Sequence, residues 1–121
     1  MKLIFVYNAN SGAINSLLDS VHKIVSPATY DCNLCAITFG NFREDELWKA
    51  FREHSEHTMV FLHKDEFEKE YASKWLPKYD FPIVLIATNA GLEIFLTSKE
   101  IASLETSEAL IERINQRSAH Y

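Results

Sequence analysis

The sequence of residues 81–96 is FPIVLIATNAGLEIFL, in which two short apolar runs flank a set of turn residues. Residues 83–87 and 92–96 are rich in β-branched and other apolar side chains that favour strands. The residues between the two runs end in Gly91, and their composition favours a tight reversal of the chain. The pattern predicts a β-hairpin that is opened by Pro82.

Helical signals follow the hairpin. Thr97 and Glu100 are three residues apart, which is the spacing of a capping box at the start of a short helix. Over residues 107–116, apolar side chains recur at helical spacing, so that Leu110 and Ile114 are expected to face the core. A C-terminal helix is therefore predicted to pack behind the hairpin.

The chain before the hairpin alternates between apolar, strand-like runs and amphipathic, helix-like patterns. The expected elements are strands over residues 3–8, 35–39 and 58–62, and helices over residues 14–25, 44–54 and 65–75. Apart from the short strand, residues 26–42 are expected to be loop, because turn-forming residues are scattered through them. This alternation predicts an α/β fold with a central mixed sheet of about four strands flanked by helices.

Length and composition favour a single domain over residues 1–121. The chain has 121 residues, of which 47% are hydrophobic, and this is enough to bury a core without a structural disulfide or metal. Its formal charge is −5, and its lysines and arginines form no cluster. Neither a nucleic acid nor a membrane surface is therefore expected as a partner.

The N-terminal residues show no targeting signal. A single lysine precedes the apolar residues 3–7, which are too few for a signal peptide, and no later apolar run approaches the length of a membrane span. We therefore expect a cytoplasmic protein. Thiols are kept reduced in that compartment, so a close cysteine pair there favours redox chemistry or metal binding over a permanent cross-link.

Cys32 and Cys35 are the only cysteines, and two residues separate them in the segment YDCNLC, residues 30–35. Two thiols at this spacing can share a disulfide or bind one metal ion. A metal would need further ligands, for which His22 is the nearest candidate and the pair His54 and His57 is the second. For each histidine an ordinary structural role is the simpler interpretation, and both cysteines can also be chemically idle.

The predicted order of elements is similar to that of the thioredoxin-like fold, and residues 58–116 carry the resemblance best. Its strongest part extends from the segment FPIVLI, residues 81–86, to the last helix. The resemblance implies a thioredoxin-like domain in which Pro82 occupies the place of that family's cis-proline.

The cysteines depart from the pattern of that family. Thioredoxins place Cys-x-x-Cys directly after the first strand, where the N-terminus of the first helix stabilises a thiolate. In this sequence residues 8–12 occupy that place, and Cys32 and Cys35 come after the first predicted helix. The thiolate activation of the family is therefore not carried over to these two residues.

Residues 7–12 together with residues 30–35 also resemble a small, uncharacterised bacterial family, some members of which carry a GTPase label. A phosphate-binding P-loop needs Gly-x-x-x-x-Gly-Lys-Ser/Thr, whereas residues 8–14 contain one glycine and no lysine. The sequence does not support GTP hydrolysis.

Three hypotheses follow for the function. In the first, Cys32 and Cys35 cycle between dithiol and disulfide without a cofactor, with Cys32 attacking and Cys35 resolving, and the partner is a protein or a small-molecule thiol. In the second, Cys32, Cys35 and His22 bind zinc or iron. In the third, the chain is a non-enzymatic binding protein that uses the loop at residues 10–12 or an exposed patch.

Overall fold

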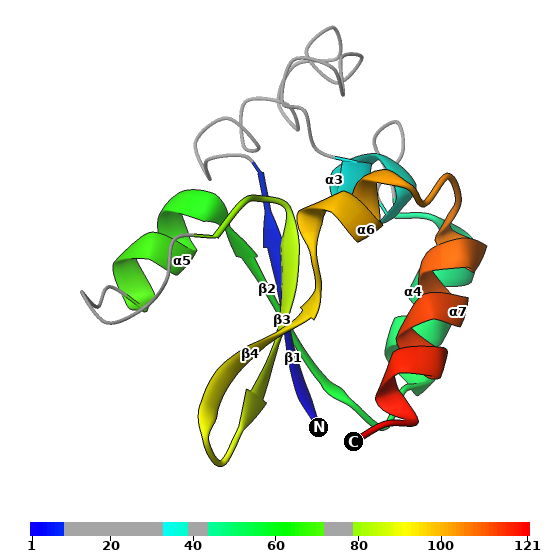
Figure 1. The fold of residues 1–121 in the computed structure, drawn as a ribbon. Coiled ribbons are helices and arrows are strands. Elements are labelled where there is room, and N and C mark those ends of the chain that lie inside the picture. The colour runs from blue at the N-terminus through cyan, green and yellow to red at the C-terminus, as the bar shows by residue number, and fades with distance from the viewer. Residues whose placement is uncertain (9–32, 39–43, 72–78) are drawn as a thin grey trace, which may run out of the picture.

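A four-stranded mixed β-sheet lies at the centre of the structure, a computed structural model that describes residues 1–8, 33–38, 44–71 and 79–121. Its strands are β1 (Lys2–Tyr7), β2 (Thr58–His63), β3 (Ile83–Thr88) and β4 (Gly91–Leu96). They lie in the order β2-β1-β3-β4 (Figure 1). β1 and β2 are parallel, whereas β3 is antiparallel to both β1 and β4. The predicted α/β class and the sheet of about four strands are confirmed.

Helices cover both faces of the sheet. The described helices are α3 (Asn33–Thr38), α4 (Glu46–His54), α5 (Lys64–Glu70), α6 (Ser98–Ala102) and α7 (Ser107–Ser118). Figure 1 shows α4 and α7 side by side on one face and α5 on the other. No helix in the described ranges is long and apolar enough to cross a lipid bilayer.

Two apolar clusters form because successive side chains of a strand point to opposite faces. On β1, Leu3 and Phe5 face the cluster that α4 and α7 complete, whereas Ile4 and Val6 face the cluster that contains Phe67 of α5. Four consecutive residues of β1 are therefore fully buried, as expected for an interior strand.

Trp48 of α4 is the largest fully buried side chain among the described residues, and it anchors the cluster on the side of α4 and α7, here called the first cluster. Its ring centroid lies 5.5 Å from that of Phe5 and 6.4 Å from that of Phe61, and both ring pairs meet edge to face. This geometry is favourable for aromatic pairs, so Trp48 ties α4 to both parallel strands.

The hairpin agrees with the sequence prediction. β3 and β4 pair with Thr88 opposite Gly91, and the Thr88 hydroxyl accepts a hydrogen bond of 3.1 Å from the backbone N–H of Ala90. Gly91 has a φ of 122°, a conformation that side chains disfavour and glycine tolerates. The peptide bond between Phe81 and Pro82 is cis.

The prediction of a short strand over residues 35–39 is wrong, because residues 33–38 form the helix α3. Its side chains Leu34 and Ile37 are three residues apart and buried on one face. The Thr38 hydroxyl donates to the Leu34 carbonyl oxygen at 2.6 Å, which is a helical contact one turn back.

Other predicted boundaries shift by a few residues. α4 begins at Glu46 and not at residue 44, because Asp45 is its N-cap. α5 ends at Glu70, and Tyr71 is its C-cap. The expected helix over residues 14–25 and the expected end of the helix at Trp75 lie outside the described residues.

Candidate functional site

Three strands bring their ends to one edge of the sheet. β1 and β2 are parallel, and their last residues, Tyr7 and His63, are register partners. β3 runs in the opposite direction and pairs Ile83 with Val6, so Pro82 begins at the edge where β1 ends. Figure 1 shows α3 and α6 at this same end of the sheet. The edge therefore combines strand ends from distant parts of the chain, which is where α/β proteins commonly place their sites.

Cys35 lies in the first turn of α3, is partly exposed and packs against the first apolar cluster. It is disulfide-bonded, and no free cysteine occurs among the described residues. Cys32 is the only other cysteine of the chain. Cys32 and His22 both lie in residues 9–32, which the structure does not describe.

Both residues between the two cysteines are fixed by long-range contacts. Leu34 is fully buried in the first cluster. The side-chain amide of Asn33 donates hydrogen bonds of 2.6 Å to the Ile101 carbonyl oxygen and 2.7 Å to that of Leu104. Ile101 lies in the last turn of α6, where its carbonyl oxygen also accepts from the Leu104 backbone N–H at 3.0 Å, and Leu104 follows the helix. Asn33 therefore joins the start of α3 to the end of α6.

The other end of α3 is held by Asp45. Its backbone N–H donates to the Thr38 carbonyl oxygen at 2.7 Å. Its carboxylate caps α4 by accepting from the Trp48 backbone N–H at 3.0 Å, and it accepts from the Ser107 hydroxyl at 2.6 Å. The Ser107 hydroxyl, followed by the Trp48 N–H, lowers the pKa of Asp45 below its ordinary value of 3.8, because both stabilise the carboxylate.

Polar groups lie behind α3 at the end of β1. Burial raises the pKa of Tyr7 to about 12, and the Thr38 side chain partly offsets this shift. Glu44 and Arg52 form a two-point ion pair with N–O distances of 2.8 and 2.9 Å, and its charges also act on the Tyr7 phenol. Tyr7 is therefore a neutral phenol at physiological pH.

His63 and Glu66 form a second polar group at the end of β2. The Glu66 carboxylate accepts from the His63 backbone N–H at 2.8 Å and lies 2.5 Å from His63 Nδ1. The backbone contact is the main reason why the pKa of Glu66 falls below its ordinary value of 4.5. This pair fixes the start of α5, and the His63 ring centroid lies 6.3 Å from that of Tyr7.

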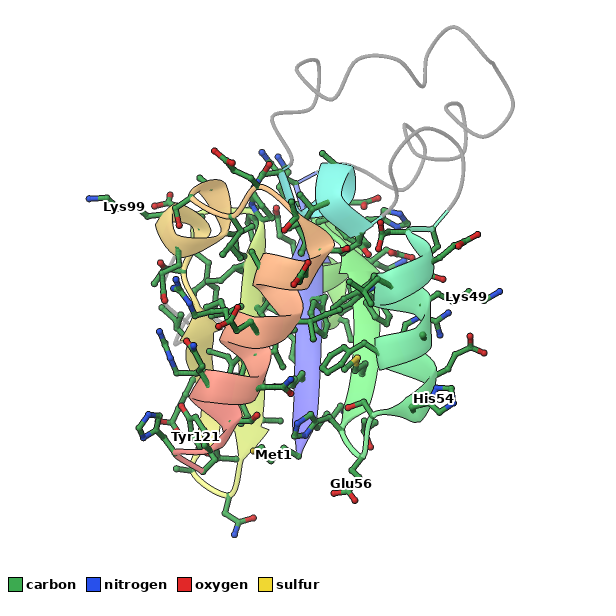
Figure 2. The ribbon with its side chains drawn as sticks, turned by 90° about the vertical axis from the view of Figure 1, so that its right-hand side faces the viewer. Met1, Lys49, His54, Glu56, Lys99 and Tyr121 are labelled. Carbon is green, nitrogen blue, oxygen red and sulfur yellow. The ribbon has the colours of Figure 1, made fainter. Side chains whose placement is uncertain are left out.

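The second histidine pair is not brought together with other metal ligands. The His54 ring is exposed and contacts the Ala50 carbonyl oxygen, and Figure 2 shows His54 pointing away from the sheet. His57 Nδ1 is buried and has no hydrogen-bond partner within the described ranges. In the part of the chain that the structure describes, no three His, Cys, Asp or Glu side chains are close enough to hold a metal ion.

The residues that hold α3 differ in how well the sequence indicates them. The position of Asp45 directly before a helical pattern is a recognisable N-cap signal. Asn33 and Ser107 gave no signal, because their partners lie more than 60 residues away in the chain.

Comparisons with protein-family models, with curated proteins and with solved structures give no match to this chain.

Proposed function

We propose that this chain is a thioredoxin-like protein that exchanges thiols and disulfides through Cys32 and Cys35. The observation that carries the proposal is the disulfide at Cys35, a partly exposed residue in the first turn of α3. Since Cys32 is the only other cysteine, the proposal assigns the other half of the bridge to it.

The thioredoxin-like part of the proposal is supported by the order of the elements. The parallel pair β1 and β2 is followed by the antiparallel hairpin of β3 and β4 and then by α7. This is the order on which the resemblance of residues 58–116 rests. A fold of this kind supplies a rigid sheet edge for a cysteine pair, but the chemistry has to be argued from the site.

The exchange involves two thiols and two electrons. A thiolate of the partner attacks the Cys32 sulfur, the bond between the two cysteine sulfurs breaks, and Cys35 leaves as a thiolate that takes up a proton. A second partner thiolate then attacks the mixed disulfide, which releases an oxidised partner and the Cys32 thiolate. In the opposite direction, Cys32 attacks a partner disulfide and Cys35 resolves the mixed disulfide.

The surroundings of Cys35 suit an exchange with an external thiol. The residue is partly exposed, whereas its neighbours Leu34 and Ile37 are buried and hold the helix on the sheet. The proposed partner is a protein or a small-molecule thiol, and the proposed compartment is the cytoplasm, where such thiols are abundant.

Cysteine variants test this proposal with glutathione disulfide as the partner. Cys35→Ser keeps the attacking thiol and lacks the resolving one, so it is expected to accumulate a mixed disulfide with glutathione that mass spectrometry detects. The reduced wild-type protein is expected to form its internal disulfide with no lasting adduct, and the double Cys→Ser variant is the unreactive control.

Two results contradict the proposal. If the wild-type protein keeps two free thiols in excess glutathione disulfide, the cysteines do not exchange. If the adduct accumulates on Cys32→Ser and not on Cys35→Ser, the roles of the two residues are reversed.

A further inference from the structure

Asn33 and Leu34, the two residues between the cysteines, are both tied to the rest of the fold. Leu34 is fully buried, and the Asn33 amide donates to the carbonyl oxygens of Ile101 and Leu104. The positions of the two flanking cysteines depend on the backbone of these residues. The contacts of Asn33 therefore act on the geometry of the cysteine pair itself.

The hydrogen bonds around α3 form a closed ring. Leu104, which lies between α6 and α7, accepts from Asn33, and Ser107, the first residue of α7, donates to the Asp45 carboxylate. Asp45 in turn donates its backbone N–H to the Thr38 carbonyl oxygen at the end of α3. The chain from Leu104 to Ser107 thus holds the first residue of α3 directly and its last residue through Asp45.

A helix as short as α3 needs such support. It has six residues, and isolated helices shorter than about 12 residues are marginal in water because nucleation is unfavourable. Among the described residues, the contacts of α3 that remain without Asn33 include the buried side chains of Leu34 and Ile37 and the hydrogen bond from the Asp45 N–H to the Thr38 carbonyl oxygen. Loss of the Asn33 hydrogen bonds is expected to destabilise α3 most in the dithiol state, because no disulfide then restrains the start of the helix.

We infer that Asn33 is a positioning residue that stabilises the disulfide relative to the dithiol by keeping the start of α3, the helix that carries Cys35, in place in both states. The inference rests on the proposed exchange between Cys32 and Cys35. When α3 is held, the reduced cysteines have a high effective concentration toward each other, and the disulfide is favoured. When Asn33 loses its contacts, the reduced state gains freedom and the disulfide becomes easier to reduce.

The test compares the reduction potentials of wild type, Asn33→Ala and Thr88→Ala in glutathione buffers. Thr88→Ala is the matched control because its hydroxyl also takes part in two hydrogen bonds, with Ala90 and Gly91. Thr88 lies beside the turn between β3 and β4, which Figure 1 shows at the opposite end of the sheet from α3. Thermal unfolding of each oxidised variant checks that it is folded.

Asn33→Ala is expected to favour reduction about tenfold, a shift of about 30 mV toward a more oxidising potential for a two-electron couple. Thr88→Ala is expected to leave the potential unchanged even though it lowers stability. If Asn33→Ala does not fold, Asn33→Ser takes its place and is expected to shift in the same direction by less.

The outcomes separate this inference from the function on which it rests. If the wild-type protein does not equilibrate with glutathione at all, the proposed function fails and the inference falls with it. If the wild type equilibrates but the Asn33 variants keep its potential, or shift no more than Thr88→Ala, the function stands and the positioning role is overturned.

Discussion

Replacing Asp45 with alanine is expected to lower the free energy of unfolding by about 2 kcal/mol. Its carboxylate caps α4 through the Trp48 N–H, and loss of such a cap costs about 1 kcal/mol. The same carboxylate accepts from the hydroxyl of Ser107, a residue that is 7% exposed. Leaving that hydroxyl without its acceptor adds about 1 kcal/mol.

Denaturant and thermal unfolding of the oxidised protein measure this effect. For a chain of 121 residues, 2 kcal/mol corresponds to a fall of about 8 °C in Tm. Ser107→Ala alone is expected to cost about 1 kcal/mol, and the double variant about 2 kcal/mol, because the shared hydrogen bond is lost only once. The sum of the two single losses in the free energy of unfolding therefore exceeds the loss in the double variant by about 1 kcal/mol.

The reasoning is refuted if the two substitutions are additive, since the side chains then do not act on each other. It is also refuted if Asp45→Ala changes stability by less than about 0.5 kcal/mol, the range of ordinary surface substitutions. Asp45→Asn is a useful comparison because it keeps the size of the side chain while removing its charge.

Two further predictions concern titrating groups. The absorbance of tyrosinate is expected to show a late step near pH 12, and Tyr7→Phe is expected to remove the contribution of Tyr7 to it, because burial raises the pKa of Tyr7 to about 12; an unchanged titration curve would assign the step elsewhere. Glu100 is partly buried, which raises its pKa, but the Thr97 backbone N–H and the Arg117 guanidinium lower it below its ordinary value of 4.5. Because the folded-state pKa is depressed, Glu100 contributes stability above its unfolded-state pKa that is lost as pH falls through the folded-state pKa. Glu100→Gln is expected to reduce the loss of stability as the pH falls through the folded-state pKa of Glu100. If the free energy of unfolding of the variant depends on pH as strongly as that of wild type, Glu100 is not the group responsible.

The sheet could be predicted from the sequence because its signals are local. The apolar runs of β1, β3 and β4 each specify a strand of six residues. The capping box of Thr97 and Glu100 is equally local, and it is present in the structure. Each of these predictions depends on neighbours in the chain and needs no knowledge of distant contacts.

The helix that carries Cys35 could not be predicted in the same way. α3 has only six residues, and its turn-rich surroundings favour a loop. Its stability comes from contacts between Asn33 and residues 68 and 71 positions away. Sequence patterns report only neighbouring residues and do not indicate such distant partners. In α3, tertiary contacts override the local preference for a loop.

For the candidate site, the sequence identified the cysteines from their spacing but not the groups that position them. Pro82 directly precedes the strand-like run of residues 83–87, so its place at the start of the hairpin is a local signal. Asn33 is one of the turn-forming residues scattered through residues 26–42, and nothing in its sequence neighbours indicates a partner for its amide. Its role depends on the end of α6 lying beside α3, which only the fold determines.

The central claim, that Cys32 and Cys35 form an exchanging dithiol, is tested most directly on protein purified without oxygen. Thiol titration before and after treatment with glutathione disulfide is combined with elemental analysis of the same sample. The account predicts two titratable thiols that both disappear on oxidation and return on reduction, with no bound metal. Stoichiometric zinc or iron that is lost in Cys35→Ser, or two thiols that survive the oxidant, contradicts it.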